Sequence, residues 1–158
     1  MHIEQYLANQ GVWFETILHR PTYTAEAAAR AMHASPTEVV KGVLIRADEY
    51  VVAVVPAYTH VDLVAVRKAL DADDVLLVHE SDLIKHFPDC EPGAVPPFGS
   101  LYDMASIVDE SLAEQPDITF CGNRHGEAIR MRYQDYCRLE QPRVASISRV
   151  REPVEVAR

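Results

Sequence analysis

Hydrophobic residues along this chain follow two periods, one typical of helices and one typical of strands. Apolar positions three and four residues apart, bounded by capping residues, glycine or proline, predict helices over residues 2–10, 25–32, 59–70, 82–87 and 133–139. Runs of β-branched and aromatic residues predict strands over residues 12–18, 42–46, 50–55, 75–78, 101–108, 118–121 and 128–132. The run 75–78 is apolar throughout and is expected to be buried. A short helical turn is expected at Ser35 and Pro36, with Glu38 completing a capping box.

The order of these elements favours an α+β fold. The apolar runs 42–46 and 50–55 are separated by a polar turn, which predicts an antiparallel hairpin at the core. Helices and strands mix irregularly, so we expect a single domain over residues 1–140, with a mixed, largely antiparallel central sheet flanked by helices. Residues 141–158 carry Pro142 and Pro153 without clear periodicity and are expected to form a C-terminal tail.

The composition is that of a single soluble domain. The chain has 158 residues, of which 48% are apolar and 25% charged, so it can bury a sizeable core. No apolar run reaches the length that spans a bilayer, and no secretion signal is visible at the N-terminus. Cys90, Cys121 and Cys137 are odd in number and widely spaced, which fits a reducing compartment better than a disulfide framework or a zinc cluster. We expect a cytoplasmic protein with no membrane partner, no metal and no cofactor.

The net charge of −9 limits the partners that the chain can bind. Proteins that coat nucleic acids are basic, because phosphate contacts dominate their affinity. Any contact with nucleic acid is therefore expected to be local and weak. Arginines gather in the last third of the chain, at positions 124, 130, 132, 138, 143, 149 and 151. They form either a local nucleic-acid footprint or a solvated surface balanced by nearby acids, and charge alone favours the solvated surface.

Residues 91–99, here called the 91–99 loop, form the most unusual stretch of the sequence. The prolines in EPGAVPPFG exclude a helix and disfavour a central strand, whereas Ala94, Val95 and Phe98 are too apolar for a solvent linker. Gly93 would allow a ligand to approach the main chain closely. Two interpretations stay open: a preformed pocket wall with amides aimed at a carbonyl oxygen, and a rigid connector between two elements.

Lys41 and His125 are the polar side chains best placed for chemistry. Lys41 lies inside an apolar run where a helical turn meets a strand, and its ammonium can hold a phosphate or stabilise charge on a carbonyl. His125 lies in a glycine-flanked loop between two strands, and such loops commonly carry ligand-binding groups. The alternatives are a lysine that reaches out to solvent and an exposed turn histidine.

Familiar catalytic patterns are missing from the sequence. There is no Gly-x-Ser-x-Gly elbow, which disfavours a serine hydrolase. Neither glycine-rich phosphate-binding pattern occurs, and the histidines lack metal-ligand spacing.

Several segments, taken together and in this order, resemble one family. They are VVKGVL at 39–44, YVVAVVPA at 50–57, VDL at 61–63, EPGAVPPFG at 91–99 and GNRH at 122–125. Their order and spacing are similar to those of the YbaK/ProX-like aminoacyl-tRNA deacylases. That family comprises the editing domain inserted in some prolyl-tRNA synthetases and its free-standing relatives. The resemblance covers roughly residues 1–140.

The resemblance implies an α+β fold around a small pocket. It also implies hydrolysis of the ester between a mischarged amino acid and the terminal adenosine of tRNA. Lys41 matches the family's functional lysine, and Gly93 and Pro97 match its Gly-x-x-x-Pro loop, whose backbone contacts the aminoacyl ester region. The resemblance implies that Lys41 and Gly93 are catalytic residues. It implies that the substrate is bound by Ala94, Val95, Pro96, Pro97, Gly122, Asn123 and His125.

The sequence departs from the family at two places. Cys121, Gly122 and Asn123 stand where relatives have Gly-Gly or Ser-Gly, which bears on amino-acid specificity. Gly42 stands where a threonine is usual, which is expected to widen the surroundings of Lys41.

The expected function is that of a trans-editing hydrolase that deacylates mischarged aminoacyl-tRNA at its 3′ end, with an aminoacyl-tRNA synthetase as a second candidate partner. No side chain is a compelling general base, and in the family the substrate's own ribose hydroxyl helps to activate water. The alternative is a non-catalytic module that binds a nucleotide or aminoacyl group in the same pocket or docks on a synthetase. The acidic charge favours this module, whereas Lys41, Gly93 and Pro97 favour the enzyme.

Overall fold

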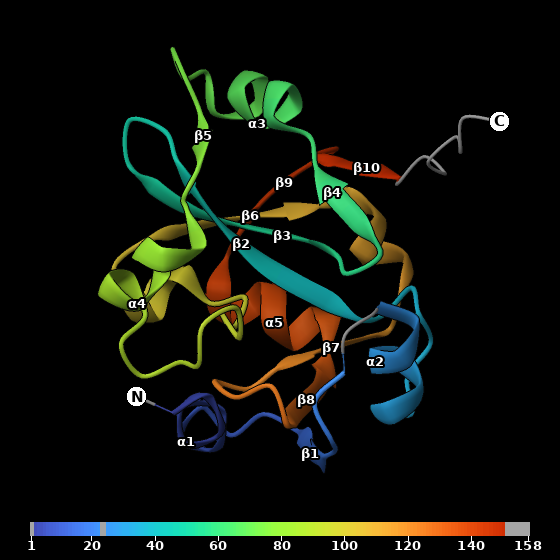
Figure 1. Cartoon of the computed structure of the whole chain (residues 1–158). Helices are drawn as coiled ribbons and strands as arrows, with labels where there is room; N and C mark the ends of the chain where they lie inside the picture. Colours follow the sequence, from blue (N-terminus) through green and yellow to red (C-terminus); the bar gives the residue numbers. More distant parts are fainter. Residues whose placement is uncertain (1, 23–24, 151–158) are drawn as a thin grey trace, which may run out of the picture.

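The hairpin expected at the core is the centre of the larger sheet in the computed structural model, which describes residues 2–22 and 25–150 (Figure 1). β2 (Val40–Arg46) pairs antiparallel with β3 (Tyr50–Pro56) in an unbroken register that sets Lys41 opposite Val55. β3 also pairs in parallel with β6 (Ala105–Asp109), so the sheet is mixed, as expected. β5 (Leu76–Leu77) and β9 (Arg143–Ala145) complete the order β5-β2-β3-β6-β9.

A second sheet is fully antiparallel. Its order is β1-β8-β7, formed by β1 (Phe14–Leu18), β8 (Glu127–Arg132) and β7 (Asp117–Cys121). A small third pair joins β4 (Thr59–Val61) to β10 (Ser148–Val150). The sequence predicted the strands of the second sheet but not their separation from the larger sheet.

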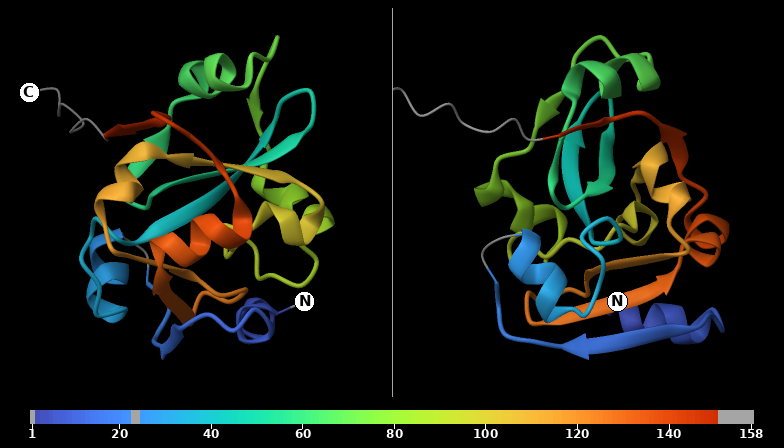
Figure 2. Two further views of the ribbon diagram at one scale, coloured as in Figure 1. Left: turned by 180° about the vertical axis from the view of Figure 1, so that it is seen from behind. Right: turned by 90° about the vertical axis from the view of Figure 1, so that its right-hand side faces the viewer.

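Helices lie around and between the sheets (Figure 2). They are α1 (Ile3–Asn9), α2 (Ala25–Ala31), α3 (Leu63–Leu70), α4 (Leu83–His86) and α5 (Tyr133–Glu140). Single 3₁₀ turns cover Glu80–Asp82, Gly99–Tyr102 and Glu110–Glu114. No helix in the described part of the chain is long and apolar enough to cross a membrane.

The main core lies between the two larger sheets. Alternate residues of β2 and β3, such as Leu44 and Val52, meet Phe120 and Ile129 from the second sheet. The other face of the larger sheet packs a second core against α3, chiefly through Val66. Each strand of the central hairpin is thus apolar on both faces, which explains its near-continuous hydrophobic run.

Three sequence expectations need correction. The helix expected over 59–70 begins only at Leu63, because Asp62 caps it by accepting a hydrogen bond from the Ala65 amide at 3.1 Å; residues 59–61 form β4 instead. The run 75–78 is not a buried strand, since Leu76 and Leu77 are 57% and 56% exposed at the edge of the sheet. Residues 101 and 102, expected to begin a strand, belong instead to a 3₁₀ turn over Gly99–Tyr102, and β6 begins only at Ala105.

The expected C-terminal tail is partly built into the fold. Residues Arg143–Ala145 pair with β6, and Ser148–Val150 pair with β4. Each strand is only three residues long, too short for the periodicity that sequence analysis requires. The expectation for the last residues, 151–158, lies outside the described residues.

Candidate functional site

The second half of the 91–99 loop is buried and held in the main core. Phe98 is fully buried, and its ring contacts Tyr6, Phe120 and Tyr136 edge to face, with centroids 5.7, 5.9 and 5.1 Å away. The Tyr136 hydroxyl also donates a hydrogen bond to the Pro97 carbonyl oxygen at 2.8 Å. Edge-to-face aromatic contacts add to the free energy gained by burial. The loop is therefore anchored by its Phe98 end.

A buried carboxylate holds the element that follows the loop. Ser100 donates to Glu140 from its amide and its hydroxyl, and Ser106 donates to Glu140 at 2.8 Å. The Ser106 hydroxyl accepts from the Gly99 amide at 3.0 Å. Burial raises the pKa of Glu140, although the hydrogen bonds from Ser100 and Ser106 act in the opposite direction. This chain of contacts fixes the end of the loop relative to α5 and β6.

The first half of the loop is exposed and rests on the turn between β7 and β8. The Glu91 amide donates to the Asn123 carbonyl oxygen at 2.8 Å. His125 Nε2 lies 2.6 Å from the Pro92 carbonyl oxygen, so this nitrogen carries the proton and donates. The sequence-predicted loop and the GNRH turn are thus brought together, with exposed Gly93 beside the His125 ring.

Gly93 has the left-handed backbone that its sequence position suggested. Its φ is +82°, and an added Cβ would lie 3.4 Å from His125 Cε1. Within residues 2–22 and 25–150, the amides of Gly93 and Val95 donate to no protein acceptor. Because proline removes the amides at 92, 96 and 97, few backbone donors remain in this rigid segment.

Lys41 lies at the start of β2, and its backbone is close to the 91–99 loop. A Cβ on Gly42 would lie only 3.1 Å from the Val95 carbonyl oxygen, so the loop packs directly onto the strand beside Lys41. Successive residues of a strand point to opposite faces, so half-buried Lys41 leaves β2 on the face of Val55, away from Val95. The expectation that Gly42 widens the surroundings of Lys41 is wrong, because Val95 and Val52 occupy that space.

Gly122 and Asn123 serve the packing of the turn. A Cβ on Gly122 would meet Ile129 Cγ1 at 2.8 Å, which only glycine avoids. Asn123 is 1% exposed, and its Oδ1 accepts from the Ile3 amide at 3.0 Å while its Nδ2 contacts Cys90 Sγ. Its φ of +68° suits an asparagine. Sequence analysis placed both residues at a pocket, whereas their contacts set the shape of the turn that presents His125.

The cysteines near the site are poor nucleophiles. Burial raises the pKa of Cys121 to about 11, and the nearby carboxylate of Glu91 adds to the rise. Burial likewise raises the pKa of Cys90. Since the thiolate is the reactive form, neither thiol is prepared for nucleophilic attack at neutral pH. Within the described ranges, no three His, Cys, Asp or Glu side chains converge as metal ligands do.

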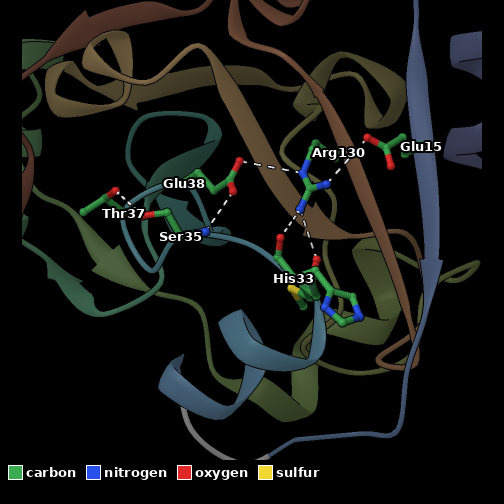
Figure 3. A network of polar contacts seen from close by, with 7 residues as sticks. Glu15, His33, Ser35, Thr37, Glu38 and Arg130 are labelled. Carbon is green, nitrogen blue, oxygen red and sulfur yellow. Dashed lines mark hydrogen bonds and ion pairs between the residues drawn. The ribbon is translucent and has the colours of Figure 1, made fainter.

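Arg130 of β8 is the centre of a separate polar network, shown in Figure 3. Its guanidinium donates to the carbonyl oxygens of Met32 at 3.1 Å and His33 at 2.6 Å, just beyond α2. The same group lies 3.5 Å from Glu15 and 3.8 Å from Glu38. Glu38 also accepts from the Ser35 amide at 2.9 Å, which confirms its expected part in a capping box.

Sequence analysis missed Arg130. It counted this residue among the arginines of the last third, as part of either a nucleic-acid footprint or a solvated surface. Arg130 is instead 16% exposed and bound to protein groups from β1 and from the segment after α2. Its position in the middle of an alternating strand was the available signal, because a charged residue there needs partners.

Comparison with known proteins identifies related chains. The sequence profile of the aminoacyl-tRNA editing domain matches residues 19–139. No curated protein matches the sequence significantly.

Solved structures share the fold at low sequence identity. The crystal structure of a hypothetical protein is 18% identical, covers 93% of this chain and 99% of its own, and superposes with a TM-score of 0.84. A candidate trans-editing enzyme for prolyl-tRNA synthetase is 19% identical, with 93% and 94% covered and a TM-score of 0.82. A candidate signal transduction protein from Marinobacter aquaeolei VT8 is 16% identical and superposes with a TM-score of 0.69. The match covers 94% of this chain but only 30% of the longer Marinobacter protein. At these identities the likeness is one of fold.

Proposed function

The chain belongs to the aminoacyl-tRNA editing domain family, and on this premise we propose that it is a trans-editing hydrolase that deacylates mischarged aminoacyl-tRNA. Its substrate is the ester between the amino acid and the terminal adenosine. The carrying observation is the anchored 91–99 loop, which holds Gly93 beside His125 and contains backbone amides, at Gly93 and Val95, that donate to no acceptor among the described residues. We further propose that it works in the cytoplasm, with an aminoacyl-tRNA synthetase as a second partner.

The proposed reaction needs little from side chains. Water adds to the ester carbonyl carbon, the bond to the ribose oxygen breaks, and that oxygen takes the proton that water gives up. The amino acid and tRNA with a free hydroxyl are the products. Negative charge develops on the carbonyl oxygen, and one preorganised donor at such an oxygen is typically worth about 3–4 kcal/mol. We assign this role to the amides of Gly93 and Val95.

Lys41 is assigned to the nucleotide end of the substrate. Its side chain leaves β2 on the face opposite to the Val95 contact. A lysine is a compact cation that binds phosphate well. In this proposal Lys41 holds the terminal phosphate, and Ala94, Val95, Pro96 and Pro97 keep the loop rigid so that little ordering entropy is lost on binding.

The GNRH turn is proposed to set selectivity among amino acids. His125 lies beside Gly93 and is half-buried, so its ring borders the space that an amino-acid side chain would enter. A pocket that sorts by size gains only about 1–3 kcal/mol per methylene. Gly122 and Asn123 act by holding His125 in place.

A panel of misacylated tRNAs tests the proposal. Alanyl-, seryl- and cysteinyl-esters are incubated with a low concentration of the protein, and release of the amino acid is followed against the spontaneous rate. At least one ester should be hydrolysed many times faster than without protein, and the rate should persist in the presence of a chelator. Binding of tRNA without hydrolysis of any ester would instead establish a non-catalytic binding module.

A further inference from the structure

A surface hollow of about 430 Å³ lies at the turn end of the β2–β3 hairpin. Figure 1 shows this region, with β5 and α4 beside the hairpin. Its walls combine cationic, aromatic and apolar side chains, among them Arg46, Tyr50, Leu77, His79, Lys85 and His86. A volume of this size is within the range of pockets that hold small ligands.

Glu80 connects this hollow to the candidate site. A Cβ on Gly93 would lie 4.0 Å from Glu80 Oε1. Glu80 begins the 3₁₀ turn Glu80–Asp82. His79, just before this turn, and Asp82, at its end, line the hollow. The hollow and Gly93 are therefore separated by one short turn.

The hollow has the groups that bind single-stranded nucleic acid. The Tyr50 and His86 rings contact each other with centroids 4.3 Å apart, and the Arg46 guanidinium lies 6.0 Å from the centre of the Tyr50 ring. Lys85 pairs with Asp82 at 3.3 Å, but their side chains are 74% and 50% exposed, so the pair is weak and Lys85 can turn to a phosphate. Aromatic surfaces for bases together with cations for phosphates are typical of single-strand binding.

We propose that this hollow, here called the nucleotide hollow, holds the unpaired nucleotides that precede the terminal adenosine of tRNA. Arg46 and Lys85 contact their phosphates, and a base stacks on the Tyr50–His86 pair. The inference rests on the proposed function, because it assumes that the ester lies at Gly93. On a chain with a net charge of −9, a local cationic site is what allows an RNA end to bind.

Binding of uncharged RNA tests the inference without any catalysis. The probe is an acceptor-stem hairpin with a single-stranded 3′ tail, and fluorescence anisotropy gives its Kd over a range of salt concentrations. In the Arg46→Ala/Lys85→Ala variant, the slope of log Kd against log salt should fall by about 0.7 for each of two lost phosphate contacts. Affinity at low salt should fall about tenfold, and removal of the tail from the probe should abolish the difference between variant and parent.

Matched variants separate local contacts from overall charge. Arg67→Ala/Lys68→Ala removes the same charge from the exposed last turn of α3 and should change Kd less than twofold. Tyr50→Phe keeps the ring and should bind as the parent does, whereas Tyr50→Leu should bind at least about fivefold more weakly. Thermal unfolding of each variant identifies any that is misfolded.

The outcomes distinguish the two proposals. Equal losses in the Arg46/Lys85 and Arg67/Lys68 variants, or no loss in either, would overturn the nucleotide hollow. Tail-dependent binding with no hydrolysis of any ester would leave the hollow standing and reject the enzyme. Unchanged RNA binding together with lost capture of a purified synthetase would identify a protein-docking surface and also reject the inference.

Discussion

Gly93 and Gly42 let the 91–99 loop lie where it does. Gly93 takes a left-handed φ of +82°, and Gly42 lets the Val95 carbonyl oxygen come within 3.1 Å of where a Cβ would be. The sequence suggested a close approach to the main chain at Gly93, whereas at Gly42 it suggested only more room around Lys41. A close approach from a segment some fifty residues away has no local signal, so only the fold reveals it.

Gly93→Ala should impair turnover more than folding. An L-residue in the left-handed region costs roughly 1–2 kcal/mol, and the new methyl group would lie in van der Waals contact with His125 at 3.4 Å, in space beside the proposed ester site. Because Gly93 is exposed, we expect a fall of only a few degrees in the thermal midpoint, together with at least a fivefold loss in kcat/KM.

Gly11→Ala is a matched control for that variant. Gly11 has a similar φ of +70°, and a Cβ there meets nothing within 4 Å, so the substitution carries the backbone strain alone. It should lower the thermal midpoint similarly and leave kcat/KM intact. If Gly93→Ala is as active as Gly11→Ala, the 91–99 loop is a plain connector.

Lys41→Ala should lower deacylation at least tenfold and leave the thermal midpoint nearly unchanged. The reason is loss of the cation proposed to hold the terminal phosphate. Steady-state hydrolysis and thermal unfolding are measured together, with exposed Lys68→Ala as the control for lost charge. Full activity would remove Lys41 from the mechanism, and an unfolded variant would point to a structural role.

Among the elements, α2 depends on one side chain from another part of the chain. Arg130 of β8 binds two carbonyl oxygens just after α2 and lies near Glu15 and Glu38 (Figure 3). Carbonyl groups at the end of a helix lack partners within the helix, and a cation there satisfies them. Arg130 thus ties α2 and the segment that precedes β2 to the second sheet.

Arg130→Met should destabilise the protein by about 2 kcal/mol, because it leaves two carboxylates and two carbonyl groups without their partner. Arg138→Met is the matched comparison. Arg138 is 63% exposed and pairs only locally with Asp135 at 3.3 Å, so its loss should cost under about 0.5 kcal/mol. Chemical denaturation measures both; equal effects would show that Arg130 is no more than a surface charge.

Sequence patterns predicted the elements that local chemistry defines. The central hairpin, α1, β7, β8 and α5 were all expected near their observed bounds, because local patterns mark them: apolar runs in the hairpin, a glycine after α1, alternation in β8 and helical periodicity in α5. The strands at 59–61, 143–145 and 148–150 were missed, because each has three residues and depends on a partner far along the chain. For the candidate site, the sequence singled out the 91–99 loop and the GNRH turn as separate segments. Their contact through Pro92 and His125 was not, since it joins residues 33 positions apart.

At the scale of the whole molecule, one carboxylate joins the segment that leads from β9 into β10 to β6 of the larger sheet. Asp109, at the end of β6, accepts hydrogen bonds from the amides of Ile147 at 2.8 Å and Ser148 at 3.0 Å, between β9 and β10. Its other oxygen accepts from the amide and hydroxyl of Ser111. Ile147 is fully buried in the second core, so Asp109 also holds in place the segment that carries Ile147.

This arrangement predicts how stability depends on pH. Burial alone would raise the pKa of Asp109, but the hydrogen bonds from Ser111, Ile147 and Ser148 outweigh it and hold the pKa below its ordinary value. A carboxyl group with a lowered folded-state pKa contributes stability above its unfolded pKa and loses it as the pH falls through the folded value. Asp109→Asn should therefore destabilise the protein at neutral pH, and its disadvantage should shrink on acidification. Denaturation of parent and variant from pH 7 down to acid measures this, with Asp48→Asn in the exposed hairpin turn as the control. A constant difference between Asp109→Asn and the parent at every pH would show that Asp109 acts by its shape and not by its charge.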